Sequence, residues 1–237
     1  MKNIWIYLLL TIGYSSGLQA QNDMIQSEAL KIKSCDDFEV NGKGDQEVWN
    51  STNWVQLNAL KDAGDVYQTQ VKVLYSDKGI YFLFWCEDLN ITSTMTEDFA
   101  DLWNEDVVEV FLWTDEQYPI YFEYEISPLN FELPILVPKM GKSFLGWRPW
   151  HYTGERRTRH ATHIQKTDQG VQGWTAEFFI PYDLMRPLNN IPPEPGTRWR
   201  ANMYRIDYDA EKPVWWAWQP IVNNFHDNHL FGIFEFE

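Results

Sequence analysis

The amino-acid sequence predicts an all-β fold, an antiparallel β-sandwich of the immunoglobulin-like or jelly-roll type. Apolar residues recur with a period of two in many short segments, which is typical of strands that bury one face. Turn-forming residues separate these segments, as in Asp77-Lys78-Gly79 and Pro192 to Gly196. The chain shows almost no long amphipathic helical pattern. Together these observations favour two packed sheets.

The segments expected to form strands follow one another along most of the chain. They cover residues 69–75, 79–87, 106–113, 120–127, 159–166, 173–180, 198–206, 214–219 and 231–236. Residues 128–157 are long for a connection, so we expect a long inserted loop that either carries function or only packs over one sandwich edge. No internal repeat or linker interrupts the chain, and residues 21–237 are expected to form a single domain.

The N-terminal residues have the pattern of a secretory signal peptide. Lys2 precedes an apolar run from Ile4 to Ile12, and the small residue Ala20 marks a cleavage position. The run is too short for a membrane helix, and no later run approaches the roughly 20 apolar residues that such a helix needs. We therefore expect residues 1–20 to be removed and the protein to be secreted or periplasmic, without a transmembrane segment.

Charge and cysteine content narrow the possible partners. The net charge of -15 argues against nucleic acid, whose phosphates require clustered positive side chains. Cys35 and Cys86 would persist in a compartment that allows disulfides, so they form either one bridge or two separate buried thiols. No Cys and His spacing typical of zinc occurs.

Three glutamates are expected to share one sheet face. In the expected strand 106–113, Glu109 falls on the same face as Val107 and Phe111, because side chains alternate across a strand. In the next strand, Glu123 and Glu125 alternate with apolar residues in the same way. Carboxylates among large apolar and aromatic side chains indicate a functional role.

Aromatic residues and a polar strand face suggest a saccharide ligand. Aromatic residues make up 16% of the chain, with 13 Trp, and aromatic rings are the usual platforms for the apolar faces of sugars. Most of these rings belong in the core, but Trp103 lies in a polar stretch, where a ring can stay exposed. Asn202 and Tyr204 share one face of strand 198–206 and can hydrogen-bond hydroxyl groups. The alternative is that Arg200 and Arg205 only form ion pairs with the glutamates.

Paired carboxylates raise a second possibility, hydrolysis of a glycosidic bond. The candidate acids are Glu109, Glu123, Glu125 and Glu177. A serine-hydrolase motif such as GxSxG is not present. His226 and His229, three residues apart, could also ligate a metal, although loop histidines seldom do. The residues alone leave a binding protein and a glycosidase both open.

Seven sequence elements, taken in order, resemble the family 9 carbohydrate-binding modules and the related DOMON-like sandwiches. They are NGKGDQEVWNST at 41–52, VKVLYSDKGIYFLFWCED at 71–88, LWNEDVVEVFL at 102–112, YFEYEISPLN at 121–130, GWTAEFFIP at 173–181, GTRWRANMYRID at 196–207 and FHDNHLFGIFEF at 225–236. The resemblance covers nearly the whole chain after the N-terminal segment. It implies a β-sandwich that binds saccharides, commonly beside polysaccharide-degrading enzymes.

The resemblance also implies a sugar site. Two aromatic rings of the family enclose a terminal sugar, and their positions correspond to Trp103 and Phe225. The polar ligands correspond to Glu109, Glu123, Glu125, Asn202 and Tyr204. The two hairpin glutamates stand where the family carries Arg and Asn. We therefore expect a non-catalytic protein of carbohydrate catabolism that binds a terminal unit of a plant-type polysaccharide or oligosaccharide, with a separate polysaccharide-degrading enzyme as a partner.

Two bound groups follow from the same resemblance. A structural calcium ion is expected near Asp45, Glu47 and Asp88, because carboxylate oxygens suit that ion. Some DOMON relatives bind haem, and Met203 or His226 would be the axial ligands here.

Overall fold

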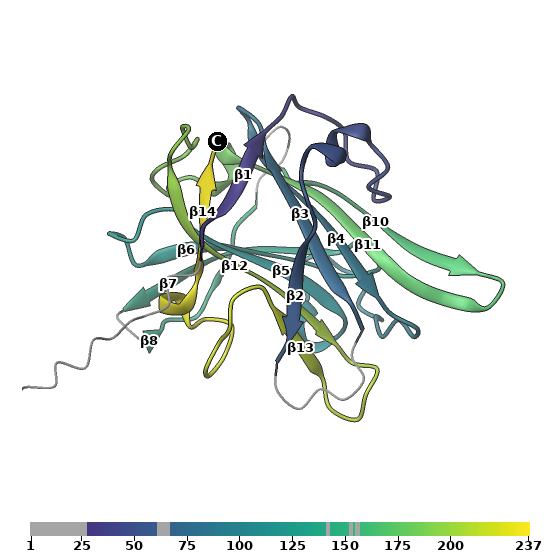
Figure 1. Ribbon diagram of the computed structural model, residues 1–237. Coiled ribbons are helices and arrows are strands. Elements are labelled where there is room, and N and C mark those ends of the chain that lie inside the picture. Colours follow the sequence, from purple (N-terminus) through teal and green to yellow (C-terminus); the bar gives the residue numbers. More distant parts are fainter. Residues whose placement is uncertain (1–27, 61–66, 141–142, 152–153, 155–156) are drawn as a thin grey trace, which may run out of the picture.

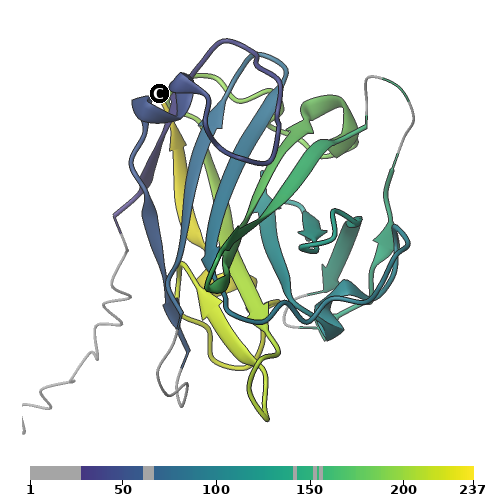
Figure 2. The ribbon, with the colours of Figure 1, turned by 90° about the vertical axis from the view of Figure 1, so that its right-hand side faces the viewer.

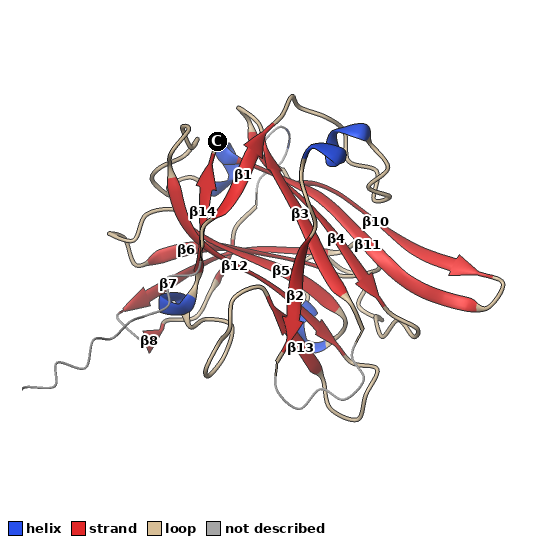
Figure 3. Cartoon of the chain, viewed as in Figure 1, coloured by secondary structure: helices blue, strands red, loops and turns tan. Residues whose placement is uncertain are grey.

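The computed structural model describes residues 28–60, 67–140, 143–151, 154 and 157–237. The predicted signal peptide, residues 1–20, lies outside them. The described residues form β-strands with a few short helical turns (Figures 1 and 3). The elements are β1 (Leu30–Ser34), η1 (Glu47–Ser51), β2 (Val55–Ala59), β3 (Thr69–Tyr75), β4 (Gly79–Glu87), η2 (Leu102–Asn104), β5 (Val107–Trp113), β6 (Ile120–Ile126), β7 (Glu132–Met140), β8 (Ser143–Phe144), β9 (Arg148–Pro149), β10 (Arg159–Thr167), β11 (Gly170–Pro181), α1 (Tyr182–Met185), β12 (Arg198–Asp207), β13 (Val214–Ala217), η4 (Asn228–Leu230) and β14 (Gly232–Phe236).

The strands form two sheets that pack face to face, which confirms the predicted sandwich. One sheet follows the order β10-β11-β4-β3, and the other follows β14-β12-β5-β6-β7. In Figure 1 the strands of the second sheet cross those of the first at a clear angle. Figure 2 shows the teal part of the chain, which includes β6 and β7, on the side away from β1.

Two strand bridges join the sheets along one edge of the sandwich. β1 pairs in parallel with both β3 and β14. β2 and β13 connect β3 to β12 through antiparallel pairs. The predicted antiparallel pairing therefore holds for the described strands except at β1. Because β3 and β12 have partners on both sides, neither presents an open edge.

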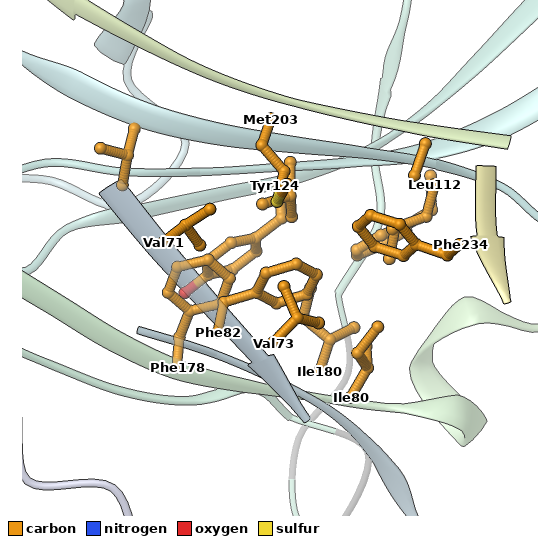
Figure 4. Packing of buried hydrophobic residues seen from close by; sticks show 14 of the residues in the cluster. Val71, Val73, Ile80, Phe82, Leu112, Tyr124, Phe178, Ile180, Met203 and Phe234 are labelled. Carbon is orange, nitrogen blue, oxygen red and sulfur yellow. The ribbon is translucent and has the colours of Figure 1, made fainter. Parts of the chain in front are cut away.

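The interior between the sheets is filled by aromatic and branched side chains. Figure 4 shows Phe82 and Phe178 from one sheet close to Tyr124 and Met203 from the other. The ring centroids of Tyr124 and Phe178 are 4.7 Å apart. Burial of each such side chain contributes about 1.5 to 3 kcal/mol, so this interface holds the two sheets together.

The nine predicted strands are confirmed with small shifts at their ends, but the predicted loop 128–157 is corrected. It contains β7, which pairs with β6 from Ile126 opposite Glu132 to Ile120 opposite Pro138. Proline has no N–H to donate and argues against a strand. β7 nevertheless forms because its other side meets only the short strands β8 and β9.

The two cysteines lie near opposite ends of β3. The Cys35 N–H donates to the Tyr75 carbonyl, whereas Cys86 pairs with Thr69. These ends are roughly 20 Å apart at the rise of a strand, and a disulfide needs Cα atoms within about 7 Å. Both thiols are free, and burial raises the pKa of each to about 12.

A second apolar cluster covers the outer face of the sheet formed by β12, β5, β6 and β7. Along β5, Val108 and Val110 face the interior, whereas Val107 and Phe111 belong to this outer cluster. The loop residues Trp103 and Trp147 pack over the same face. Glu109 shares the face of Val107 and Phe111, so it lies beneath these loops.

Candidate functional site

Strand register brings the three predicted glutamates together. Glu109 of β5 lies opposite Glu125 of β6, and Phe111 lies opposite Glu123. Carboxylate oxygens of the three glutamates lie within 4.8 Å of one another. Glu109, Glu123 and Glu125 are 2%, 3% and 1% exposed, respectively. The sequence alternation therefore predicted their shared face correctly.

A cavity of about 330 Å³ lies at these carboxyl groups. Its lining includes five of the predicted sugar-binding residues: Trp103, Glu109, Glu123, Glu125 and Phe225. Small-molecule sites commonly measure about 300 to 1,000 Å³ and combine apolar walls with a few polar groups. The cavity has both properties at the size of a small ligand.

Aromatic rings form its walls. η2 places Trp103 just before β5, and Trp147 meets it edge-on with ring centroids 5.9 Å apart. The Phe225 ring stacks on Tyr204 at 4.0 Å and 7°. Trp215 lies edge-on to Phe225 at 5.4 Å. Because Tyr204 covers one face of Phe225, a ligand can contact only the other face.

Asn202 and Tyr204 do not line the cavity, which differs from the prediction. Both are fully buried on β12. The Tyr204 hydroxyl donates to the Phe225 carbonyl at 2.9 Å. Asn202 Oδ1 accepts from the N–H groups of Met203 and Gln219. Their polar atoms thus hold the segments around Phe225 and Gln219 in place.

Burial dominates the acid–base properties of the glutamates. It raises the pKa of Glu109 to about 8. The pKa values of Glu123 and Glu125 are also raised well above their usual range, by burial first and by the charge of Glu109 second. No donor group of the described residues reaches Glu109 Oε1, Glu123 Oε2 or Glu125 Oε2. Burial therefore favours the protonated form of these carboxyl groups over three negative charges, and Glu109 holds a proton at neutral pH.

The charged side chains nearby do not neutralise this cluster. Arg200 pairs with Glu116 at 3.2 Å, and Arg205 is buried against Asp88 and Asp207. The predicted alternative, in which these arginines pair with the three glutamates, is therefore wrong.

His226 does not supply a positive charge to the cluster either. Burial lowers the pKa of His226 to about 4, so the ring is neutral at pH 7 although its Nδ1 lies 3.7 Å from Glu123 Oε2. The same Nδ1 lies 2.5 Å from the Tyr121 hydroxyl, which can donate to it. Lys139 Nζ donates to the His226 carbonyl and to Asn228 Oδ1. Hence the described lining of the cavity includes no cationic group at neutral pH.

The three predicted calcium ligands do not form one site. Gly44 lies beside Leu83 of β4, which places its neighbour Asp45 near that point of the strand. Asp88 follows the end of β4, five residues or roughly 16 Å further along. Asp88 is fully buried and its Oδ2 lies 3.0 Å from Arg205 Nη2. Asp45 and Glu47 are exposed, and Asp45 accepts a hydrogen bond from Asn41.

Another oxygen cluster contains Asp88. Carboxylate oxygens of Asp88, Asp207 and Asp209 lie within 4.8 Å of one another. Arg205 contributes a guanidinium to the same place, with Nη2 bonded to both Asp88 and Asp207. These three carboxylates fit calcium chemically better than the predicted set does.

Glu177 has a structural role. Its Oε2 accepts from the N–H groups of Asn41 and Gly42, both at 2.8 Å. Its Oε1 accepts from the indole N–H of Trp49 at 2.8 Å. Glu177 therefore fixes residues 41–49 on β11, and both of its oxygens are engaged.

The two predicted haem ligands lie on different faces of one sheet. Met203 belongs to the interior between the sheets, whereas His226 lines the outer cavity. They cannot ligate one haem together. His229, the other residue of the predicted histidine pair, is exposed and does not line the cavity.

Several cavity residues were not predicted. Trp147 lies between β8 and β9, whereas Phe144 belongs to β8, Trp215 to β13 and His226 to the segment before η4. Phe144 and Trp215 are 44% and 38% exposed, which is unusual for large rings. Trp147 stood out in sequence as an aromatic among Pro and Gly residues. The other three carried no pattern that placed them at one site.

The described residues include no helix long and apolar enough to cross a membrane. A search of curated proteins gave no significant match. Solved structures do share the fold. A candidate carbohydrate-binding protein from Bacteroides uniformis superposes with a TM-score of 0.72 at 15% identity, covering 88% of this chain and 99% of that chain.

Two further structures show a family 9 carbohydrate-binding module from Caldicellulosiruptor kristjanssonii. The complex with cellotriose has a TM-score of 0.64 at 16% identity and covers 88% of this chain and 94% of that chain. The complex with glucose has a TM-score of 0.62 at 16% identity and covers 89% and 96%. A model of the family described as carbohydrate family 9 binding domain-like matches residues 40–236. Because this match spans most of the sequence, the chain belongs to that family.

Proposed function

We propose that this protein binds a sugar unit in the cavity between Trp103 and Phe225, without catalysing a reaction. One observation carries the proposal: a single cavity combines aromatic walls with three inward carboxyl groups. Aromatic faces pack against the apolar faces of a sugar ring, and carboxyl oxygens accept hydrogen bonds from its hydroxyl groups.

Different side chains of the cavity are proposed to contact the ring and the hydroxyl groups of the sugar. Trp103 and Phe225 supply ring contacts, with Tyr204 fixing Phe225 from behind. Glu109, the third residue of β5, and Glu125 opposite it accept hydrogen bonds from the sugar hydroxyl groups at the cavity floor. Because burial favours the protonated form of these groups, each such hydrogen bond contributes about 0.5 to 1.5 kcal/mol.

The relatives support a saccharide ligand. The Caldicellulosiruptor module was solved with cellotriose and with glucose. For this chain, the proposal is a terminal unit of a plant-type polysaccharide or oligosaccharide, bound in support of carbohydrate catabolism by a separate polysaccharide-degrading enzyme.

Titration of the purified protein with cellotriose tests the site. Tryptophan fluorescence and calorimetry are expected to show saturable binding that is lost in Trp103→Ala. Trp54→Ala is the matched control, because Trp54 is 39% exposed and does not line the cavity. Equal affinity of Trp103→Ala and Trp54→Ala for sugar would contradict the proposed site.

The glycosidase alternative is less well supported. A glycosidase needs two acids whose environments push their pKa values apart. Here burial raises the pKa of Glu109, Glu123 and Glu125 alike, and Glu177 is engaged elsewhere. Release of reducing sugar from cellulose or xylan, lost in Glu109→Gln, would favour the enzyme.

Two further proposals concern export, which the sequence predicts, and calcium, for which the structure offers another set of carboxylates than the predicted one. We propose export with cleavage near Ala20, which N-terminal sequencing of the mature protein would test. We also propose that any structural calcium binds Asp88, Asp207 and Asp209. A rise in melting temperature on adding calcium, lost in Asp209→Asn, would support that site.

A further inference from the structure

Among the residues that the structure describes, none supplies a cationic partner to the three carboxyl groups at the cavity floor. Arg200 and Arg205 are paired elsewhere, the His226 ring is neutral at pH 7, and Lys139 donates to the oxygens of His226 and Asn228. Buried carboxylates are normally paired with a positive group or a metal. A ligand that brings its own positive charge would complete this site.

The geometry of the floor matches a primary ammonium group. Glu109 Oε1, Glu123 Oε2 and Glu125 Oε2 are buried and receive no hydrogen bond from the described residues. One oxygen from each carboxyl group lies within 4.8 Å of the other two. Three oxygens separated by the full 4.8 Å leave a central point about 2.8 Å from each, so one small donor group at the centre is within N–H···O distance of all three carboxyl groups. A protonated amine has three N–H donors, one for each carboxyl group.

We propose that the preferred ligand is an amino sugar, whose protonated amine lies among Glu109, Glu123 and Glu125 while its ring packs against Trp103 and Phe225. This inference rests on the proposed function, because it names the class of sugar that the same cavity takes. It uses the two glutamates of β6, Glu123 and Glu125, which add two buried carboxyl groups to that of Glu109.

The cavity walls favour an organic cation over a metal ion. Trp103, Trp147 and Phe225 present rings, and aromatic faces attract an ammonium group within about 6 Å of the centroid. Calcium needs six to eight oxygen ligands. Beyond the three carboxyl groups, Asn224 is the one side-chain amide among the described lining residues, and its Oδ1 already accepts from the His226 N–H.

Ligand charge and cluster ionisation are linked. In the free protein burial favours the protonated form of the three carboxyl groups, whereas a positive group among their oxygens favours the ionised form. Binding of the amine should therefore release protons to the solvent. A neutral sugar, which brings no charge, should release few or none.

Calorimetry with three β-1,4-linked trimers tests the inference on the full protein after signal removal. The ligands are the trimers of glucosamine, N-acetylglucosamine and glucose, measured at pH 7 in two buffers of different ionisation enthalpy. We expect the glucosamine trimer to bind about tenfold or more tightly than the other two, since hydrogen bonds to charged groups are the stronger ones. Only its apparent enthalpy should depend on the buffer, because only its binding releases protons.

Substitutions of the cavity glutamates test whether these residues cause the preference for the glucosamine trimer. Glu123→Gln and Glu125→Gln keep the shape of the side chain and remove its charge, so each should bring the ratio of glucosamine to glucose affinity towards one. Glu211→Gln, an exposed carboxylate outside the cavity, is the control and should leave this ratio unchanged. Circular dichroism checks that each variant is folded. If one of the two cavity variants does not fold, the other still tests the inference.

Three outcomes would overturn the inference. Equal affinity for the glucosamine and glucose trimers would refute amine recognition while leaving the proposed function intact. Binding of no trimer at all would refute both. Sugar binding that requires calcium, with calcium alone giving a titration heat that Glu123→Gln abolishes, would assign the three carboxyl groups to a metal.

Discussion

Replacing Glu109 with glutamine should remove the pH dependence of stability that this residue causes. Burial raises its pKa from 4.5 to about 8, so the native protein holds a proton that the unfolded chain releases between these values. Stability therefore falls as pH rises through this window, by up to about 1.4 kcal/mol per pH unit. Across the full interval, ionisation of Glu109 lowers the free energy of unfolding by on the order of 4 kcal/mol.

Glu109→Gln removes this cost. At pH 5 the wild-type group is protonated in the native state, and the variant should differ from wild type by less than about 1 kcal/mol. At pH 8 the variant should be more stable than wild type by at least about 2 kcal/mol. This is less than the full cost of ionising Glu109, because Glu109, Glu123 and Glu125 titrate as a coupled group. The measurement is urea unfolding followed by tryptophan fluorescence at pH 5, 6, 7 and 8.

The matched control for this series is Glu211→Gln, an exposed residue whose pH curve should run parallel to wild type. If the Glu109→Gln and wild-type curves also run parallel, Glu109 does not hold a proton in the folded state. The account of a protonated, buried cluster would then be wrong.

Three further predictions concern residues that position the site or the fold. Glu177→Gln should weaken the hydrogen bonds that residue 177 accepts from residues 41–49. We expect the free energy of unfolding to fall by about 3 kcal/mol and the sugar affinity to stay unchanged. Loss of sugar affinity in the folded variant would contradict a purely structural role of Glu177. Tyr204→Phe removes the hydroxyl that donates to Phe225 and should cost about 1 kcal/mol of stability and weaken sugar binding a few-fold; calorimetry showing full affinity would mean that this bond does not position Phe225. Arg205→Met leaves Asp88 and Asp207 unpaired in a buried place and should destabilise the fold by about 3 to 5 kcal/mol at pH 8, as urea unfolding would show; a neutral effect would refute the ion-pair account.

The local periodicity of the sequence was enough to predict nine of the strands and the shared face of the three glutamates, but not β1, β2 or β7. Alternation along β5 and β6 assigns Glu109, Glu123 and Glu125 to one face, and the register of the hairpin then places them together. This works because strand alternation is a local property of the backbone.

Features that depend on contacts between distant segments were not predicted. β7 was missed because Pro134 and Pro138 disfavour a strand in general, and only its place next to the short strands β8 and β9 permits it. Asn202 alternates correctly with its neighbours, but the segment around Gln219 covers it and uses its polar atoms. Sequence spacing does not show which loop covers which face.

A crystal structure with a bound oligosaccharide tests the central claim most directly. The account predicts a terminal sugar ring against Trp103 and the free face of Phe225, with one of its polar groups within hydrogen-bonding distance of Glu109. A sugar bound elsewhere on the sandwich, with the cavity at Glu109 occupied only by water, would contradict it.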